Sequence, residues 1–111
     1  MKAMLARYAC LAAALFSVAA PAGAADIKAG EAKAKEVCQA CHGLDGNSQT
    51  ADYPKIGGQR QDYLAKALRD YKSGARKNAI MAGFAGTLSA HDIENLAAYY
   101  ARQPAVVVVK H

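Results

Sequence analysis

The segment Cys38-Gln39-Ala40-Cys41-His42 decides the fold of this 111-residue chain. On an α-helix, residues three and four positions apart lie on the same face. Cys38, Cys41 and His42 therefore point in one direction when the segment is helical. Two thiols and one imidazole ring on a shared face indicate a site for a covalently held cofactor.

The spacing of these residues is that of a c-type haem attachment site. The two thiols can form thioethers with the two haem vinyl groups, which leaves the imidazole of His42 within reach of the iron. A disulfide between Cys38 and Cys41 would give His42 no role, and a thioredoxin-like site would need a βαβ setting. A structural zinc site would need four ligands, and only the widely spaced His91 and His111 remain to supply them.

The first 24 residues predict a secretory signal peptide, with a basic start and an apolar run over 8–20. We expect cleavage after Ala24 or, as second choice, after Ala25. The run is shorter than the roughly 20 residues of a membrane-spanning helix, so no transmembrane segment is expected after signal removal. Cys10 lies in this segment and is expected to leave with it, and export places the other two cysteines where free thiols do not persist.

The expected mature chain, 25–111, is one domain of about 87 residues, in which a hydrophobic core alone is marginal. A core over 26–103 and a tail over 104–111 are expected within it. Signal removal lowers the formal net charge from +5 to about +3. This mild charge does not predict nucleic-acid binding, which needs a concentrated basic stripe.

Apolar periodicity predicts three helices, over about 28–41, over about 60–73 and from Ser89 to Pro104. The stretches 42–58 and 75–88 are rich in turn formers or lack a pattern, and are predicted to be irregular. Asp26, Ser89 with Asp92, and Gly74 are the expected caps. Four valines in the tail favour an extended backbone, and no other strand pattern occurs, so the fold class is all-α.

Haem iron has a second axial position, which Met, His or no side chain can take. Met1 and Met4 lie in the signal peptide, so Met81 is the methionine that remains. We expect Met81 to bind the iron from the irregular stretch 75–88. His91, next to a helix start, is the main rival, and His111 lies at a chain end.

In its ordered set of motifs, the sequence resembles the class I c-type cytochromes, and most of all the small bacterial periplasmic proteins of the c(4)/c(553) kind. The likeness covers roughly 26–103. The matching stretches are Cys38–Gly43, Asp45–Ser48, Tyr53–Gln59, Tyr63-Leu64, Ile80–Gly83, Leu88-Ser89 and Leu96–Tyr100.

The resemblance implies a cytochrome c-like fold, with three main helices and ordered loops around one covalent haem c. It makes Met81 the distal ligand and the carbonyl of Pro54 the acceptor of a hydrogen bond from His42, which orients the ring. Gly30 and Ala34 would let the first helix cross the last near Tyr99. The expected pocket residues are Ile56, Tyr63, Leu64, Leu68 and Leu96. Two features depart from the group: a second haem motif is missing, and the tail matches nothing in it.

These expectations combine into a periplasmic one-electron carrier that is not an enzyme. Its partners would be a membrane or periplasmic oxidase, reductase or dehydrogenase, and we expect a monomer. Lys72, Arg76 and Lys77 form a basic cluster that can steer acidic partners, although it is equally explained as a solvated helix end. Two alternatives stay open: an electron-entry subunit of a dehydrogenase or oxidase complex, and a five-coordinate cytochrome that binds a gas.

Overall fold

The computed structural model describes residues 12–16 and 24–106. Most of the predicted signal peptide and the end of the valine-rich tail lie outside these residues. Within the described part, every regular element is helical, and no strand is present. The all-α prediction is therefore confirmed.

The helix predicted over 28–41 forms from residue 27 to residue 42, in three consecutive pieces. These are α1 (Ile27–Lys33), the π-helical segment η1 (Ala34–Cys38) and α2 (Gln39–His42). Asp26 caps its start as predicted, because the Asp26 carboxylate accepts a hydrogen bond of 3.1 Å from the N–H of Ala29. The π turn was not predicted, and nothing in the helix-forming sequence of η1 marks it.

Two further predicted helices are confirmed. The first is α3 (Gln61–Ser73), which ends at Gly74 with a φ of 85°, the left-handed conformation that favours glycine. The second is α5 (Ala90–Ala101). Ser89 and Asp92 form the predicted capping box, with backbone-to-side-chain bonds of 2.9 and 3.0 Å.

The prediction of an irregular stretch over 75–88 was wrong in its middle. A fourth helix, α4 (Ala79–Ala85), forms there. The side chain of Asn78 caps it by accepting a 3.0 Å hydrogen bond from the N–H of Met81. Gly83 and Gly86 disfavour a helix prediction here. In addition, seven residues are too few to show a clear apolar period.

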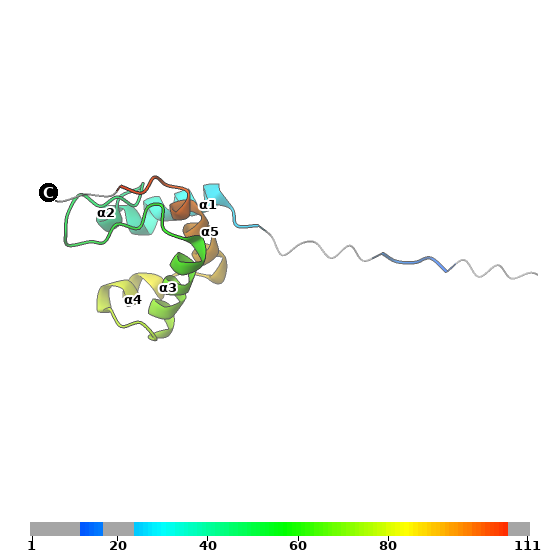
Figure 1. Cartoon of the computed structure of the whole chain (residues 1–111). Helices are drawn as coiled ribbons and strands as arrows, with labels where there is room; N and C mark the ends of the chain where they lie inside the picture. The colour runs from blue at the N-terminus through cyan, green and yellow to red at the C-terminus, as the bar shows by residue number, and fades with distance from the viewer. Residues whose placement is uncertain (1–11, 17–23, 107–111) are drawn as a thin grey trace, which may run out of the picture.

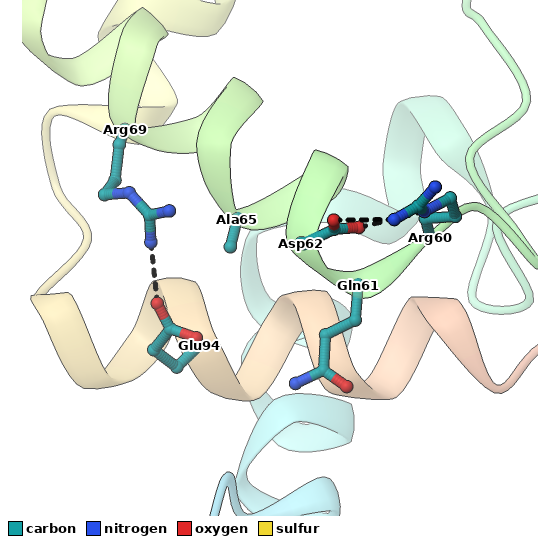
Figure 2. A pocket seen from close by; sticks show the side chains of 6 residues that line it. All are labelled: Arg60, Gln61, Asp62, Ala65, Arg69 and Glu94. Carbon is teal, nitrogen blue, oxygen red and sulfur yellow. Dashed lines mark hydrogen bonds and ion pairs between the residues drawn. The ribbon is translucent and has the colours of Figure 1, made fainter.

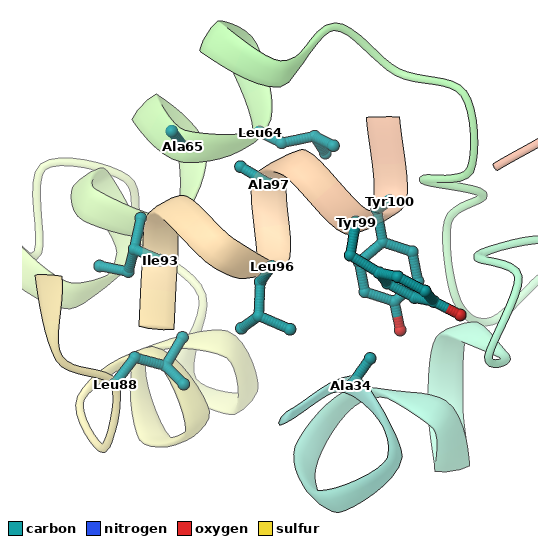
Figure 3. Packing of buried hydrophobic residues seen from close by; sticks show 9 residues of the cluster. All are labelled: Ala34, Leu64, Ala65, Leu88, Ile93, Leu96, Ala97, Tyr99 and Tyr100. Atoms are coloured by element: carbon teal, nitrogen blue, oxygen red, sulfur yellow. The ribbon is translucent and has the colours of Figure 1, made fainter. Parts of the chain in front are cut away.

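The core forms where α5 crosses α1 on one side and packs against α3 on the other (Figures 1 and 3). Leu96, at 1% exposure, lies at its centre. The predicted close crossing near Tyr99 is confirmed, because a Cβ built on Gly30 would lie 2.9 Å from the Cβ of Tyr99. The other members of this cluster are Ala34, Leu64, Ala65, Leu88, Ile93, Ala97 and Tyr100.

The segment that follows α2 has no regular structure but is held by α5. The hydroxyl of Tyr99 donates to the carbonyl of Leu44 at 2.7 Å, and that of Tyr100 donates to the carbonyl of Gly43 at 3.1 Å. Asn47, which is 4% exposed, donates to the carbonyl of Pro104 at 2.8 Å. The turn directly after His42 is thus fixed to the last helix and to the chain that leaves it.

A shallow hollow lies between the outer surfaces of α3 and α5 (Figure 2). Ion pairs join Arg69 to Glu94 at 2.7 Å across it and Arg60 to Asp62 at 2.9 Å at its edge. Exposed pairs of this kind contribute between about 0 and 1 kcal/mol each. The charged side chains that line the hollow pair with one another. None of the predicted site residues lies in the hollow.

Candidate functional site

A cavity of about 330 Å³ is lined by α2 and α4, with α3, α5 and the loop after α2 supplying the rest of its wall. In Figure 1, α2 lies in the upper part of the fold, and α4 lies in the lower part beside α3. All of the predicted site residues line this cavity: Cys38, Cys41, His42, Pro54, Ile56, Tyr63, Leu64, Leu68, Leu96 and Met81. Residues spread over more than forty positions of the chain thus meet around one space.

Cys38 and Cys41 are half-buried and form part of the cavity wall. Burial raises the pKa of the Cys38 thiol to about 11, and the nearby Tyr100 hydroxyl offsets only part of this rise. The face shared by Cys38, Cys41 and His42, predicted from their spacing, points into the cavity.

His42 is buried, and its ring is fixed by one hydrogen bond. Its Nδ1 lies 2.8 Å from the carbonyl oxygen of Pro54. A carbonyl oxygen only accepts, so Nδ1 carries the hydrogen and Nε2 keeps a free lone pair. The Tyr53 ring lies edge-on to His42, with 6.4 Å between ring centroids. This arrangement presents an oriented imidazole that is ready to bind a metal.

Met81 lines the cavity from the first turn of α4 and is half-buried. Its rival His91 is exposed in the first turn of α5 and does not line the cavity. His111 lies outside the described residues. Within the described part of the chain, Met81 is therefore the candidate ligand that shares a cavity with His42.

Several residues that line the cavity were not predicted from the sequence. Phe84 and Leu88 were missed because α4, which brings this part of the chain to the cavity, was not predicted. Tyr71 belongs to the apolar stripe of α3 that includes Tyr63 and Leu64, so its period was a usable signal. Val37 and Tyr53 also line the cavity, and only their nearness to the cysteines and to Pro54 pointed to them.

The side chains around the cavity fit only some of the groups that the motif allows. No three His, Cys, Asp or Glu side chains gather into a metal cluster within 12–16 and 24–106, so a structural zinc site lacks its ligands. A haem c fits: the two thiols could form its thioethers, His42 Nε2 and the Met81 sulfur are potential donors to its iron, and the wall is largely apolar.

Comparison with known proteins decides between these groups. The family model described as cytochrome C oxidase, cbb3-type, subunit III matches residues 25–99. This chain belongs to the class I c-type cytochromes. The cytochrome is 48% identical over 80 residues to cytochrome c4 of Pseudomonas aeruginosa, covering 72% of this chain and 39% of that protein.

Two other similar proteins differ in how much of their length this cytochrome covers. It is 42% identical over 83 residues to cytochrome c-554(548) of Halomonas halodenitrificans, covering 72% of this chain and 99% of that one. The crystal structure of cytochrome c4 from Pseudomonas stutzeri matches with a TM-score of 0.70 and 42% identity, covering 76% of this chain and 48% of that one. The cytochrome thus spans less than half the length of the c4 proteins.

The cofactor of this cytochrome is haem c, attached through Cys38 and Cys41. Among the described residues of the cytochrome, no helix has the length and apolar character needed to cross a membrane. The cytochrome c-like fold expected from the motifs is confirmed by the c4 structure, although α4 adds a fourth helix to the three expected.

Proposed function

We propose that this chain is a periplasmic one-electron carrier whose haem iron is bound by His42 and Met81. One observation carries the proposal: the imidazole of His42 and the thioether of Met81 line the same cavity from α2 and α4. The bond from His42 Nδ1 to the Pro54 carbonyl supports it, since it leaves Nε2 for the metal.

Haem c bound here supplies reversible exchange of one electron between Fe(II) and Fe(III). The surrounding residues keep the coordination the same in both states. Pro54 holds the ring of His42, and the cap on Asn78 holds the turn that carries Met81. A thioether donor and an apolar wall both favour Fe(II), which raises the reduction potential.

With side chains on both sides of the iron, no position is left for a substrate or a gas. The chain therefore acts on other redox proteins and is not an enzyme in its own right. Its partners are a membrane or periplasmic oxidase, reductase or dehydrogenase, reached as a monomer through small, brief contacts. Export by the signal peptide over 1–24 places it in the periplasm.

The absorption spectrum of the purified protein tests this proposal, in the oxidised and reduced states. We expect sharp low-spin haem c bands on reduction and a weak long-wavelength sulfur-to-iron(III) band on oxidation. Met81→Ala should abolish that band and leave the far-UV circular dichroism unchanged. His91→Ala is the matched control, because His91 is exposed outside the cavity, and it should keep the band.

Three results would contradict the proposal. A high-spin wild type that readily binds carbon monoxide when reduced would favour the gas-binding alternative. A low-spin wild type that lacks the sulfur-to-iron(III) band, and that becomes high-spin in His91→Ala but not in Met81→Ala, would assign the second ligand to His91. Purification only as part of a larger complex would instead favour the subunit alternative.

A further inference from the structure

Three charged side chains line the haem cavity: Asp52, Lys55 and Arg76. The ammonium group of Lys55 donates to the backbone carbonyl of Ser48 at 2.9 Å. Arg76 has no such backbone acceptor among its side-chain contacts. It also forms no ion pair with an Asp or Glu of the described chain. The guanidinium is thus a positive charge at the cavity that forms no ion pair with a carboxylate of the described chain.

The guanidinium of Arg76 is nevertheless held in place by two tyrosines of α3. Its Nη1 donates to the hydroxyl of Tyr63 at 3.3 Å. Its central carbon lies 4.8 Å from the centroid of the Tyr71 ring, a cation–π contact. Both tyrosines line the same cavity. A guanidinium has five N–H donors, so these contacts orient Arg76 and leave most of its donors available.

An oriented guanidinium of this kind is suited to a carboxylate, which it can bind through two parallel hydrogen bonds. Haem c carries two propionate carboxylates, which are the charged groups of an otherwise apolar ring. We propose that Arg76 binds one haem propionate at the mouth of the cavity and fixes that edge of the haem. This inference rests on the proposed function, since it requires the haem to occupy this cavity.

The proposal has an electrostatic consequence that can be measured. An ionised propionate stabilises Fe(III), and a paired arginine neutralises that effect while lowering the pKa of the propionate. Without the arginine, the propionate pKa rises toward neutral pH. Deprotonation of the propionate then lowers the reduction potential as the pH increases, which adds a step to the pH profile.

The test is a redox titration of the loaded protein between pH 5 and pH 9, for wild type, Arg76→Gln, Arg76→Lys, Lys55→Gln and Lys77→Gln. Lys77 is the matched control, because it is adjacent, exposed and not part of the cavity wall. We expect Arg76→Gln to lower the reduced-to-oxidised ratio several-fold at a fixed potential and neutral pH, and to add a pH-dependent step. Arg76→Lys should restore part of the ratio, and Lys77→Gln should add no step.

Equal shifts in Arg76→Gln and Lys77→Gln, with no new step in either, would overturn the proposal and leave Arg76 as a surface charge. A new step in Lys55→Gln, and not in Arg76→Gln, would also overturn it by placing the carboxylate at Lys55. A protein that shows no haem c bands at all would instead contradict the proposed function. The spectra recorded before each titration therefore separate the two failures.

Discussion

The backbone of Gly30 lies directly against the backbone of Asn95, so that a Cβ built on Gly30 would lie 2.1 Å from the Asn95 carbonyl oxygen. Asn95 also accepts, through its side-chain oxygen, a 2.8 Å hydrogen bond from the N–H of Asp26. The start of α1 is therefore joined to α5 by a contact that leaves no room for a side chain.

We expect Gly30→Ala to lower the free energy of unfolding by about 3 kcal/mol, because the added methyl group forces α1 and α5 apart. Denaturant unfolding followed by circular dichroism measures this change. Gly83→Ala is the control, since a Cβ on Gly83 would meet nothing within 4 Å. It should be neutral or raise the stability by up to about 1 kcal/mol, as Ala does for Gly in a helix. A change in the free energy of unfolding that is no larger for Gly30→Ala than for Gly83→Ala would mean that the crossing tolerates a methyl group.

Tyr99→Phe and Tyr100→Phe each remove one hydroxyl that holds the turn after His42. Each should cost about 1 kcal/mol or somewhat more, because a part-buried carbonyl loses its donor. Tyr100 lines the cavity and Tyr99 does not, so only Tyr100→Phe is expected to shift the haem bands. Haem-band shifts of the same size in both variants would show instead that loss of either hydroxyl alters the haem environment through the turn after His42.

Ser89→Ala should lower the free energy of unfolding by about 1 kcal/mol at pH 7, through loss of the helix cap of α5.

The Ser89 N–H also lowers the pKa of Asp92 below its usual 3.8 by donating to the carboxylate. A carboxyl whose pKa is lower in the folded state stabilises the fold above the unfolded-state pKa, and this stabilisation is lost as the pH falls through the folded-state pKa. The stability difference between wild type and Asp92→Asn should therefore shrink as the pH is lowered from 5 to 2, in urea titrations at each pH. A constant difference would contradict this role.

Asn47→Asp should destabilise the fold by about 2 kcal/mol, because the buried amide of Asn47 donates to the carbonyls of Asp45 and Pro104. A carboxylate has no donor for these carbonyls and brings a charge to a position only 4% exposed. The melting temperature measures the change. Gln49→Glu makes the same chemical change at an exposed side chain of the same loop, and should cost less than half as much.

The parts of the fold that were predictable are those with a local cause. Cys38, Cys41 and His42 come together because helix geometry places them on one face, and Asp26 and Ser89 cap helices through bonds to residues three positions away. The order of the motifs also predicts Met81 and Pro54 at the site, and both residues line the cavity.

The unpredicted features depend on contacts that the sequence pattern does not contain. The helix α4 is only seven residues long. Asn78 caps it, but no apolar periodicity follows Asn78 in the sequence to indicate a helix. The π turn in η1 has no distinct composition. The position of Arg76 between Tyr63 and Tyr71 depends on the turn after α3, which brings its side chain back over that helix. In the sequence alone, Arg76 was one member of a basic cluster.

The helix α4 packs mainly against α3, away from the crossing of α1 and α5. Breaking its contacts therefore leaves the central crossing intact, so α4 can open in a local fluctuation that costs less free energy than global unfolding. Amide hydrogen exchange would register this difference as weaker protection in α4 than in α5. The molecule thus combines a firmly held attachment segment with a helix, α4, that carries Met81 and that we expect to open separately. If Met81 binds the iron as proposed, exchange of that ligand would follow the opening of α4.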